Sequence, residues 1–155
     1  MFHVVDDAKL IGKIVVTILE SHGYRAMSFS CPQDYINFVK EPSFKSPIAV
    51  FTDVNMPKMN GYEMMSSVSK LKPGLKFVVM TSEPDTQSKY ITKACMHLVK
   101  PFAPNVIIEL VNSLIQCHVH SPSNHHGCAS VGNREAFSIG DWSCPHRCKR
   151  SALSK

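Results

Sequence analysis

The sequence predicts an α/β fold in which helices cover both faces of a parallel β-sheet. Two observations support this fold class: short apolar segments alternate with segments of helical spacing, and the alternation repeats five times along the chain. Strands that alternate with helices form parallel sheets with right-handed crossovers, and uninterrupted apolar runs are typical of strands buried on both faces. Five strand–helix pairs are therefore expected.

The expected strands are short, and the second is the least apolar of the five. In chain order they cover Phe2–Val5, Ala26–Ser30, Ile48–Phe51, Phe77–Met80 and His97–Val99. No apolar run approaches the roughly 18 residues that cross a bilayer, so no membrane partner is predicted.

The expected helices follow the strands in turn. Apolar residues at intervals of three and four place them at about Ala8–Ser21, Gln33–Lys40, Met64–Leu71, Asp85–Ala94 and Pro104–Leu114. Gly23 occupies the position of a glycine that ends the first helix. Pro104 falls in the first turn of the last helix, where a missing N–H leaves no hydrogen bond unmade.

The composition of the 155 residues changes after Gln116. Residues 1–116 hold twelve lysines and arginines and ten acidic residues, whereas residues 117–155 hold five and two, with four of the six cysteines and five of the eight histidines. We therefore predict one domain at 1–116 and a flexible, mildly basic tail at 117–155. The first residues lack the basic region and the cleavage site of a secretory signal, so a cytoplasmic location is expected.

Charged side chains follow the predicted strands at one end. Asp6 and Asp7 follow the first strand, Asp53 the third, Thr81 the fourth and Lys100 the fifth. The carboxyl ends of parallel strands meet at one edge, where sites of such sheets form. Three close carboxylates repel one another, and one lysine does not neutralise them. A Mg²⁺ ion with oxygen ligands is the predicted partner of this cluster.

These residues resemble the receiver domain of two-component response regulators. The resemblance rests on Asp6-Asp7, the run from Asp53 through Met56-Pro57 to Gly61, Thr81, and Lys100-Pro101-Phe102, and it spans about residues 2–116. It implies a flavodoxin-like fold with strand order 2-1-3-4-5, similar to single-domain chemotaxis regulators. It also implies a phosphoacceptor that signals, rather than an enzyme acting on free substrates.

By the same resemblance, Asp53 would accept a phosphoryl group, Lys100 would pair with Asp53 and then with the phosphoryl oxygens, and Thr81 would donate its hydroxyl to the phosphoryl group. Asp7 would bind Mg²⁺ directly and Asp6 mainly through water. Asp53 and the backbone carbonyl of Asn55 would complete the ligands, with Mn²⁺ as an alternative ion.

The resemblance further implies a switch and partners. Thr81 and the residue three positions before Lys100, here His97 in place of the usual Tyr or Phe, would move together. A cis peptide would join Lys100 to Pro101. Apart from the resemblance, Gly61 suits a loop position with unusual φ/ψ before the third helix, with a glycine that simply starts the helix as the alternative. A histidine kinase or histidine phosphotransfer protein would donate the phosphoryl group. A downstream protein would bind the face of the fourth helix, fifth strand and fifth helix.

The tail favours no specific chemistry. Cys128, Cys144 and Cys148 with a histidine form an alternative zinc site, but only the last two have a ligand-like spacing, so we expect free thiols without zinc. Four basic residues within nine near Arg147 permit electrostatic contact without specificity, and nucleic acid is not an expected partner.

Two alternative functions stay open at this point. A Mg²⁺-dependent phosphohydrolase with an aspartyl-phosphate intermediate would also place a nucleophilic aspartate at a strand end, but the position of its general acid is occupied by Asn55. A phosphate-independent interaction module with a metal-binding tail would not need the full set of Asp6, Asp7, Asp53 and Lys100.

Overall fold

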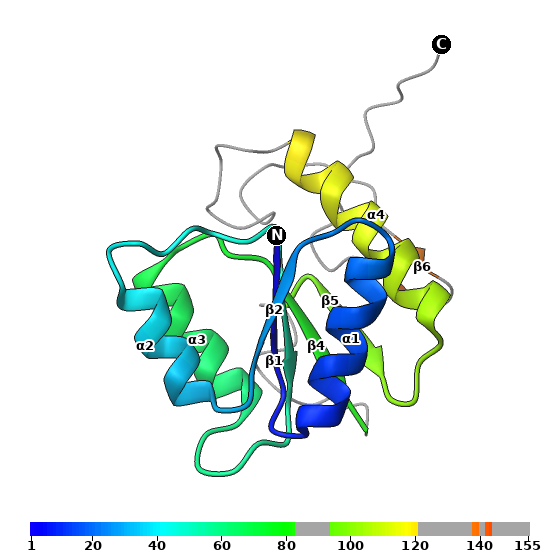
Figure 1. The fold of residues 1–155 in the computed structure, drawn as a ribbon. Helices are drawn as coiled ribbons and strands as arrows, with labels where there is room; N and C mark the ends of the chain where they lie inside the picture. Colours follow the sequence, from blue (N-terminus) through cyan, green and yellow to red (C-terminus); the bar gives the residue numbers. More distant parts are fainter. Residues whose placement is uncertain (83–93, 121–137, 140–141, 144–155) are drawn as a thin grey trace.

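The computed structural model describes residues 1–82 and 94–120 together with residues 138–139 and 142–143 (Figure 1). For residues 116–120, 138–139 and 142–143 the structure describes the backbone alone. The helix expected at Asp85–Ala94 lies outside the described residues, apart from Ala94 itself.

The centre of the fold is a five-stranded parallel sheet. Its strands are β1 (Phe2–Val5), β2 (Ala26–Phe29), β3 (Val50–Asp53), β4 (Phe77–Thr81) and β5 (Met96–Val99). They lie in the order β2-β1-β3-β4-β5, and every neighbouring pair is parallel. The predicted fold class and strand order are confirmed. The third strand starts two residues later than expected, because the chain enters the β3 ladder only at Val50.

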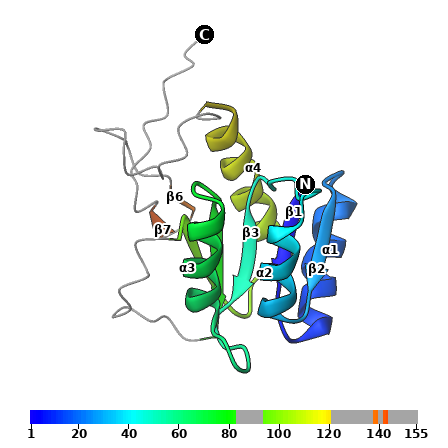
Figure 2. The same ribbon diagram turned by 90° about the vertical axis from the view of Figure 1, so that its left-hand side faces the viewer.

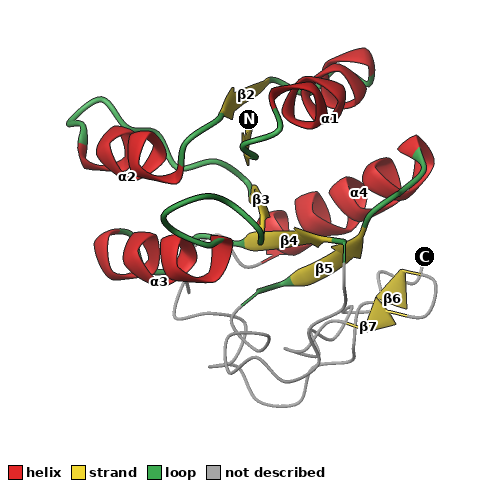
Figure 3. Ribbon diagram, turned by 90° about the horizontal axis from the view of Figure 1, so that it is seen from below, coloured by secondary structure: helices red, strands yellow, loops and turns green. Residues whose placement is uncertain are grey.

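Helices cover both faces of the sheet, as Figure 3 shows along the strands. On one face lie α1 (Lys9–Ser21) and α4 (Pro104–His120), which contact each other. On the other lie α2 (Pro32–Lys40) and α3 (Gly61–Leu71), side by side in Figure 2. The label α4 denotes the last of the five helices expected from the sequence.

The core has two layers, one on each face of the sheet. Alternate residues of a strand point to opposite faces, so Phe2 and Val4 pack toward α1 and α4, whereas Val5 packs toward α2 and α3. Each residue of β1, β3 and β4 is buried. This burial on both sides explains why these strands are mostly apolar, with His3, Thr52, Asp53 and Thr81 as the buried polar exceptions.

Local sequence signals set several helix ends. Gly23 follows α1 with a φ of 81°, as a C-terminal glycine requires. Asn60 accepts the Glu63 N–H, and Glu63 accepts the Asn60 N–H, each at 2.9 Å, which closes a capping box before α3. The peptide between Lys100 and Pro101 is cis, as predicted.

The last helix continues beyond the change in composition. It ends at His120, four residues after the predicted boundary at Gln116. Beyond it, β6 (Ser138–Ile139) and β7 (Trp142–Ser143) pair in antiparallel fashion. In the parts of the chain that the structure describes, no helix is long and apolar enough to cross a membrane.

Candidate functional site

Three carboxylates meet at the carboxyl end of the sheet. Asp6 and Asp7 follow β1, and Asp53 is the last residue of the neighbouring strand β3. One carboxylate oxygen from each of the three lies within 4.8 Å of the others. Asp6 and Asp53 are buried, whereas Asp7 is exposed. The cluster is therefore open to solvent on the side of Asp7.

Lys100 reaches this cluster from the loop after β5. Its ammonium donates to Oδ1 of Asp53 at 2.6 Å and to Oδ2 of Asp6 at 2.8 Å. The backbone N–H of Lys100 donates to the Thr81 carbonyl at 2.7 Å, which fixes the lysine to the end of β4. The contact with Asp53 matches the prediction. The contact with Asp6 was not predicted, and it makes the ammonium a bridge between two strands.

Burial and charge act in opposite directions on these groups. Burial raises the pKa of Asp6 above its ordinary value, although the Lys100 ammonium and the Ala8 N–H favour its ionised form. Burial alone would lower the pKa of Lys100, but its hydrogen bonds to Asp53 and Asp6 outweigh burial and raise that pKa. The lysine therefore stays charged, and one positive charge faces three acidic groups.

The donor set fits a hard divalent cation. All three groups offer oxygen, and two ligands of one Mg²⁺ ion lie at most about 4.2 Å apart, so small side-chain movements suffice. Both oxygens of Asp6 already accept hydrogen bonds, one from Lys100 and one from the Ala8 N–H at 2.9 Å. Asp7 is exposed and Lys100 contacts only Oδ1 of Asp53, so these two carboxylates have more room for a direct metal bond.

Gly61 is needed because of close backbone contact with Asp53, and not because of the unusual φ/ψ that was predicted. We expected an unusual φ/ψ, but Gly61 begins α3 and is not among the described residues with positive φ. A Cβ atom on Gly61 would instead lie 2.1 Å from the backbone oxygen of Asp53. The glycine is needed because α3 begins in contact with the Asp53 backbone.

The unusual backbone conformation lies three residues earlier, at Lys58, which has a φ of 67° and is exposed. A left-handed conformation costs an L-residue with a long side chain about 1 kcal/mol, and asparagine tolerates it better. We expect Lys58→Asn to raise the free energy of unfolding by about 0.5 kcal/mol and Lys58→Val to lower it by about 1 kcal/mol. Urea denaturation measures both, and equal stability of the two variants would contradict this expectation.

The other predicted site residues that the structure describes differ in their exposure to solvent. Thr81 is buried at the end of β4, and its carbonyl is tied to Lys100. Asn55 is exposed on the loop after β3. His97 is half-buried on β5, with its Nε2 atom buried. The cysteines of the alternative zinc site, Cys128, Cys144 and Cys148, lie outside the described residues.

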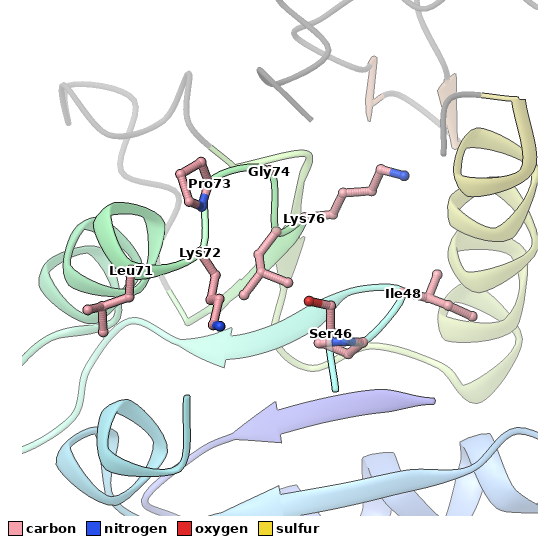
Figure 4. Close-up of a pocket in the computed structure, with 9 residues that line it drawn as sticks. Ser46, Ile48, Leu71, Lys72, Pro73, Gly74 and Lys76 are labelled. Carbon is pink, nitrogen blue, oxygen red and sulfur yellow. The ribbon is translucent and has the colours of Figure 1, made fainter. Parts of the chain in front are cut away.

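A second hollow lies at the opposite end of the sheet, beside the starts of β3 and β4 (Figure 4). This cavity of about 190 Å³ is bounded by residues 46–48 and 71–76 and has no carboxylate in its lining. Figure 4 shows Lys72 and Lys76 extending in different directions, so their ammonium groups do not converge on one ligand position. The acidic edge is therefore the better candidate for the functional site.

Sequence comparison identifies a family for most of the chain. The family model of the response regulator receiver domain matches residues 2–112. The response regulator SaeR from Staphylococcus aureus is 28% identical over 115 residues, which cover 72% of this chain and 49% of SaeR. The chain thus spans about half the length of the curated relatives it matches.

Solved structures show the same fold. A response regulator receiver domain protein (CheY-like) from Methanospirillum hungatei matches with a TM-score of 0.68 and 22% identity, over 77% of this chain and 97% of that chain. The response regulator TrrA from Thermotoga maritima, solved in complex with Mg²⁺ and BeF, matches with a TM-score of 0.63 and 24% identity, over 73% and 96%.

Proposed function

The chain belongs to the response regulator receiver domain family, and on that basis we propose that Asp53 is the residue that accepts the phosphoryl group in a two-component phosphorelay. The observation that carries this proposal is the Lys100 ammonium, which bridges Asp53 and Asp6 across the end of the sheet. A lysine ammonium held between two buried carboxylates is positioned to stabilise the negative charge of a phosphoryl group that is transferred to one of them.

In this reaction an oxygen of Asp53 attacks the phosphorus of a phosphohistidine or a small acyl phosphate. The new O–P bond forms as the P–N or P–O bond of the donor breaks, and the bonding pair leaves with the donor. Lys100 shifts its hydrogen bond from the Asp53 carboxylate to a phosphoryl oxygen. The hydroxyl of Thr81, at the end of β4, then donates to the phosphoryl group.

Asp6, Asp7, Asp53 and the backbone carbonyl of Asn55 are the proposed holders of Mg²⁺, with Mn²⁺ as an alternative. When bound, the ion would neutralise charge on the transferring phosphoryl group. Two observations support this assignment: the three carboxylates lie close together, and the related TrrA was solved with Mg²⁺ and BeF. Asp6, whose two oxygens already accept hydrogen bonds, would act mainly through water.

We assign the output to the surface formed by β5 and α4; the fourth helix of the expected face, residues 85–94, lies outside the described residues apart from Ala94. Thr81 and His97 would form the switch, because the two strands that carry them are paired. The donor would be a histidine kinase or a histidine phosphotransfer protein, and the output would be a protein contact, in the cytoplasm. The proposed domain covers residues 1–116, and we propose no zinc or nucleic-acid function for residues 117–155.

The phosphohydrolase alternative fits the site less well. Such an enzyme needs an acid two residues after its nucleophile, and the amide of Asn55 does not donate a proton to a leaving group. We therefore propose a signalling phosphoacceptor that does not turn over free phosphate esters. The phosphate-independent module is also less favoured, because a half-buried Lys100 that bridges two buried carboxylates has no evident use in it.

Incubation with acetyl phosphate and Mg²⁺ tests the proposal. We expect intact mass to increase by one phosphoryl group, stable in acid and lost in base, and we expect no increase without Mg²⁺ or in Asp53→Asn. Asp34→Asn, an exposed aspartate on α2, is the matched control and should be phosphorylated normally. An adduct that persists in Asp53→Asn would contradict the assignment, and steady phosphate release from phosphomonoesters would favour the enzyme.

A further inference from the structure

His3 is an imidazole enclosed in the core between the sheet and α2. It lies on β1 and has no exposed surface. Four aromatic rings surround it, with centroids between 5.7 and 6.1 Å from its own: Phe29, Tyr35, Phe38 and Phe44. The enclosure is apolar except for the Tyr35 hydroxyl, so it stabilises a neutral ring far better than a charged one.

Only one of the two ring nitrogens of His3 has a hydrogen-bond partner in this enclosure. Nδ1 of His3 lies 3.1 Å from the Tyr35 hydroxyl, whereas Nε2 is buried with no hydrogen-bond partner. No described carboxylate bonds to either ring nitrogen. Two positive groups lie around this enclosure: the amino group of Met1, just before β1, and Lys72, whose Nζ lies 5.6 Å from the centroid of the Phe44 ring. An imidazolium would therefore have neither a counter-charge nor a full set of acceptors.

The four rings come from one continuous stretch of chain. Phe29 ends β2, Tyr35 and Phe38 lie on α2, and Phe44 follows that helix. This stretch begins at the last residue of the outer strand β2 and contains α2, one of the two helices on that face. Contiguous segments of this kind open as local units before the whole domain unfolds.

We propose that His3 is an acid-sensitive latch that holds residues 29–44 against the sheet while its ring is neutral and releases them when the ring takes up a proton. The hydrogen bond to Tyr35 joins β1 to α2, and the three phenyl rings close over it. Burial lowers the pKa of His3 to about 4, below the value of an exposed imidazole, about 6.5.

The sign of the pH effect follows from this order of pKa values. The unfolded chain binds the proton below about pH 6.5, while the folded chain resists it down to about pH 4, so stability falls as the pH falls through that window. For this group alone, the unfolding constant should rise about 20-fold between pH 7 and pH 5.

The test compares the full chain with the double variant His3→Phe/Tyr35→Phe, which replaces both polar partners by apolar rings. Between pH 7 and pH 5, the unfolding constant measured by urea denaturation should rise about 20-fold more in the wild type than in the variant. His22→Gln, an exposed histidine at the end of α1, is the matched control and should retain the rise. Hydrogen exchange at pH 5 should show protection lost first in α2 and kept in α4.

If the double variant does not fold, titration of the His3 ring by NMR in the wild-type protein tests the latch independently. A midpoint near 4 supports the latch, and a midpoint near 6.5 overturns it. Equal loss of protection in α2 and α4 would also overturn it, because acid would then destabilise the whole domain and not release one segment.

Discussion

Replacement of Lys100 by methionine is expected to lower the free energy of unfolding at neutral pH by about 3–5 kcal/mol and to remove phosphorylation. Methionine has a similar length, so the change deletes the ammonium with little change in volume. Asp6 and Asp53 then lie buried beside each other without the bridge that now joins them at 2.8 and 2.6 Å. Two buried like charges without a counter-charge repel strongly, and no ammonium is left to stabilise the negative charge of the phosphoryl group.

The loss in Lys100→Met should depend on pH and on Mg²⁺. Burial already raises the pKa of Asp6, and removal of the ammonium raises it further, so the folded variant takes up a proton more readily than the unfolded chain. Its stability relative to the wild type should therefore recover as the pH falls toward 5. Mg²⁺ should also stabilise the variant, because the ion binds the folded cluster and not the unfolded chain.

Urea denaturation with and without Mg²⁺ measures both effects, and Lys45→Met, an exposed lysine in the loop after α2, serves as control. The control should retain normal stability and full phosphorylation. A Lys100→Met protein as stable as the wild type at pH 7 would mean that the bridge between Asp6 and Asp53 contributes nothing to the fold.

Gly61→Ala is expected to lower the free energy of unfolding by about 2–4 kcal/mol and to slow phosphorylation about 100-fold. The new methyl group would lie 2.1 Å from the Asp53 backbone oxygen and 3.0 Å from its carbonyl carbon. Backbone atoms cannot rotate away, so α3 and the end of β3 must separate. Because Asp53 belongs to that backbone, its carboxylate moves away from Lys100.

Gly12→Ala makes the same chemical change with the opposite expected sign. Gly12 is buried inside α1, and a Cβ there would meet only the Ser28 side chain at an ordinary 3.6 Å. Alanine should therefore stabilise that helix by about 0.5–1 kcal/mol. Thermal denaturation and the rate of adduct formation with acetyl phosphate distinguish the two variants. Equal effects at both positions would show that helix propensity, and not contact with Asp53, explains the glycine at 61.

Most of the framework of the site could be predicted from the sequence. Apolar runs located the buried strands, and the residues directly after them, Asp6, Asp7 and Lys100, therefore had to lie at one edge. The same patterns did not predict the residues at which the strands begin and end. Asp53 is a paired residue of β3 although it is charged, because apolar character reports burial and not hydrogen bonding along the ladder.

Side-chain contacts and backbone strain could not be predicted in the same way. The Lys100–Asp6 bond depends on the reach of one side chain over β4 and β3, which strand order alone does not specify. A glycine can be required because φ is positive or because another part of the backbone lies close, and the first reason was predicted for Gly61 whereas the structure shows the second. Lysine does not favour the left-handed conformation, so the sequence did not predict the positive φ of Lys58. The change in composition at Gln116 did not end the last helix, because no glycine or proline interrupts the chain before Pro122.

The bridge made by Lys100 also has a consequence for the order of folding. Its two partners lie 47 and 94 residues earlier in the chain, so it joins sequence-distant segments and forms only after long loops have closed. On a growing chain, β1 and β3 can bring Asp6 and Asp53 together before the lysine has been synthesised. The carboxylates at this edge then repel one another, and the fifth strand both completes the sheet and brings the lysine that offsets part of this negative charge.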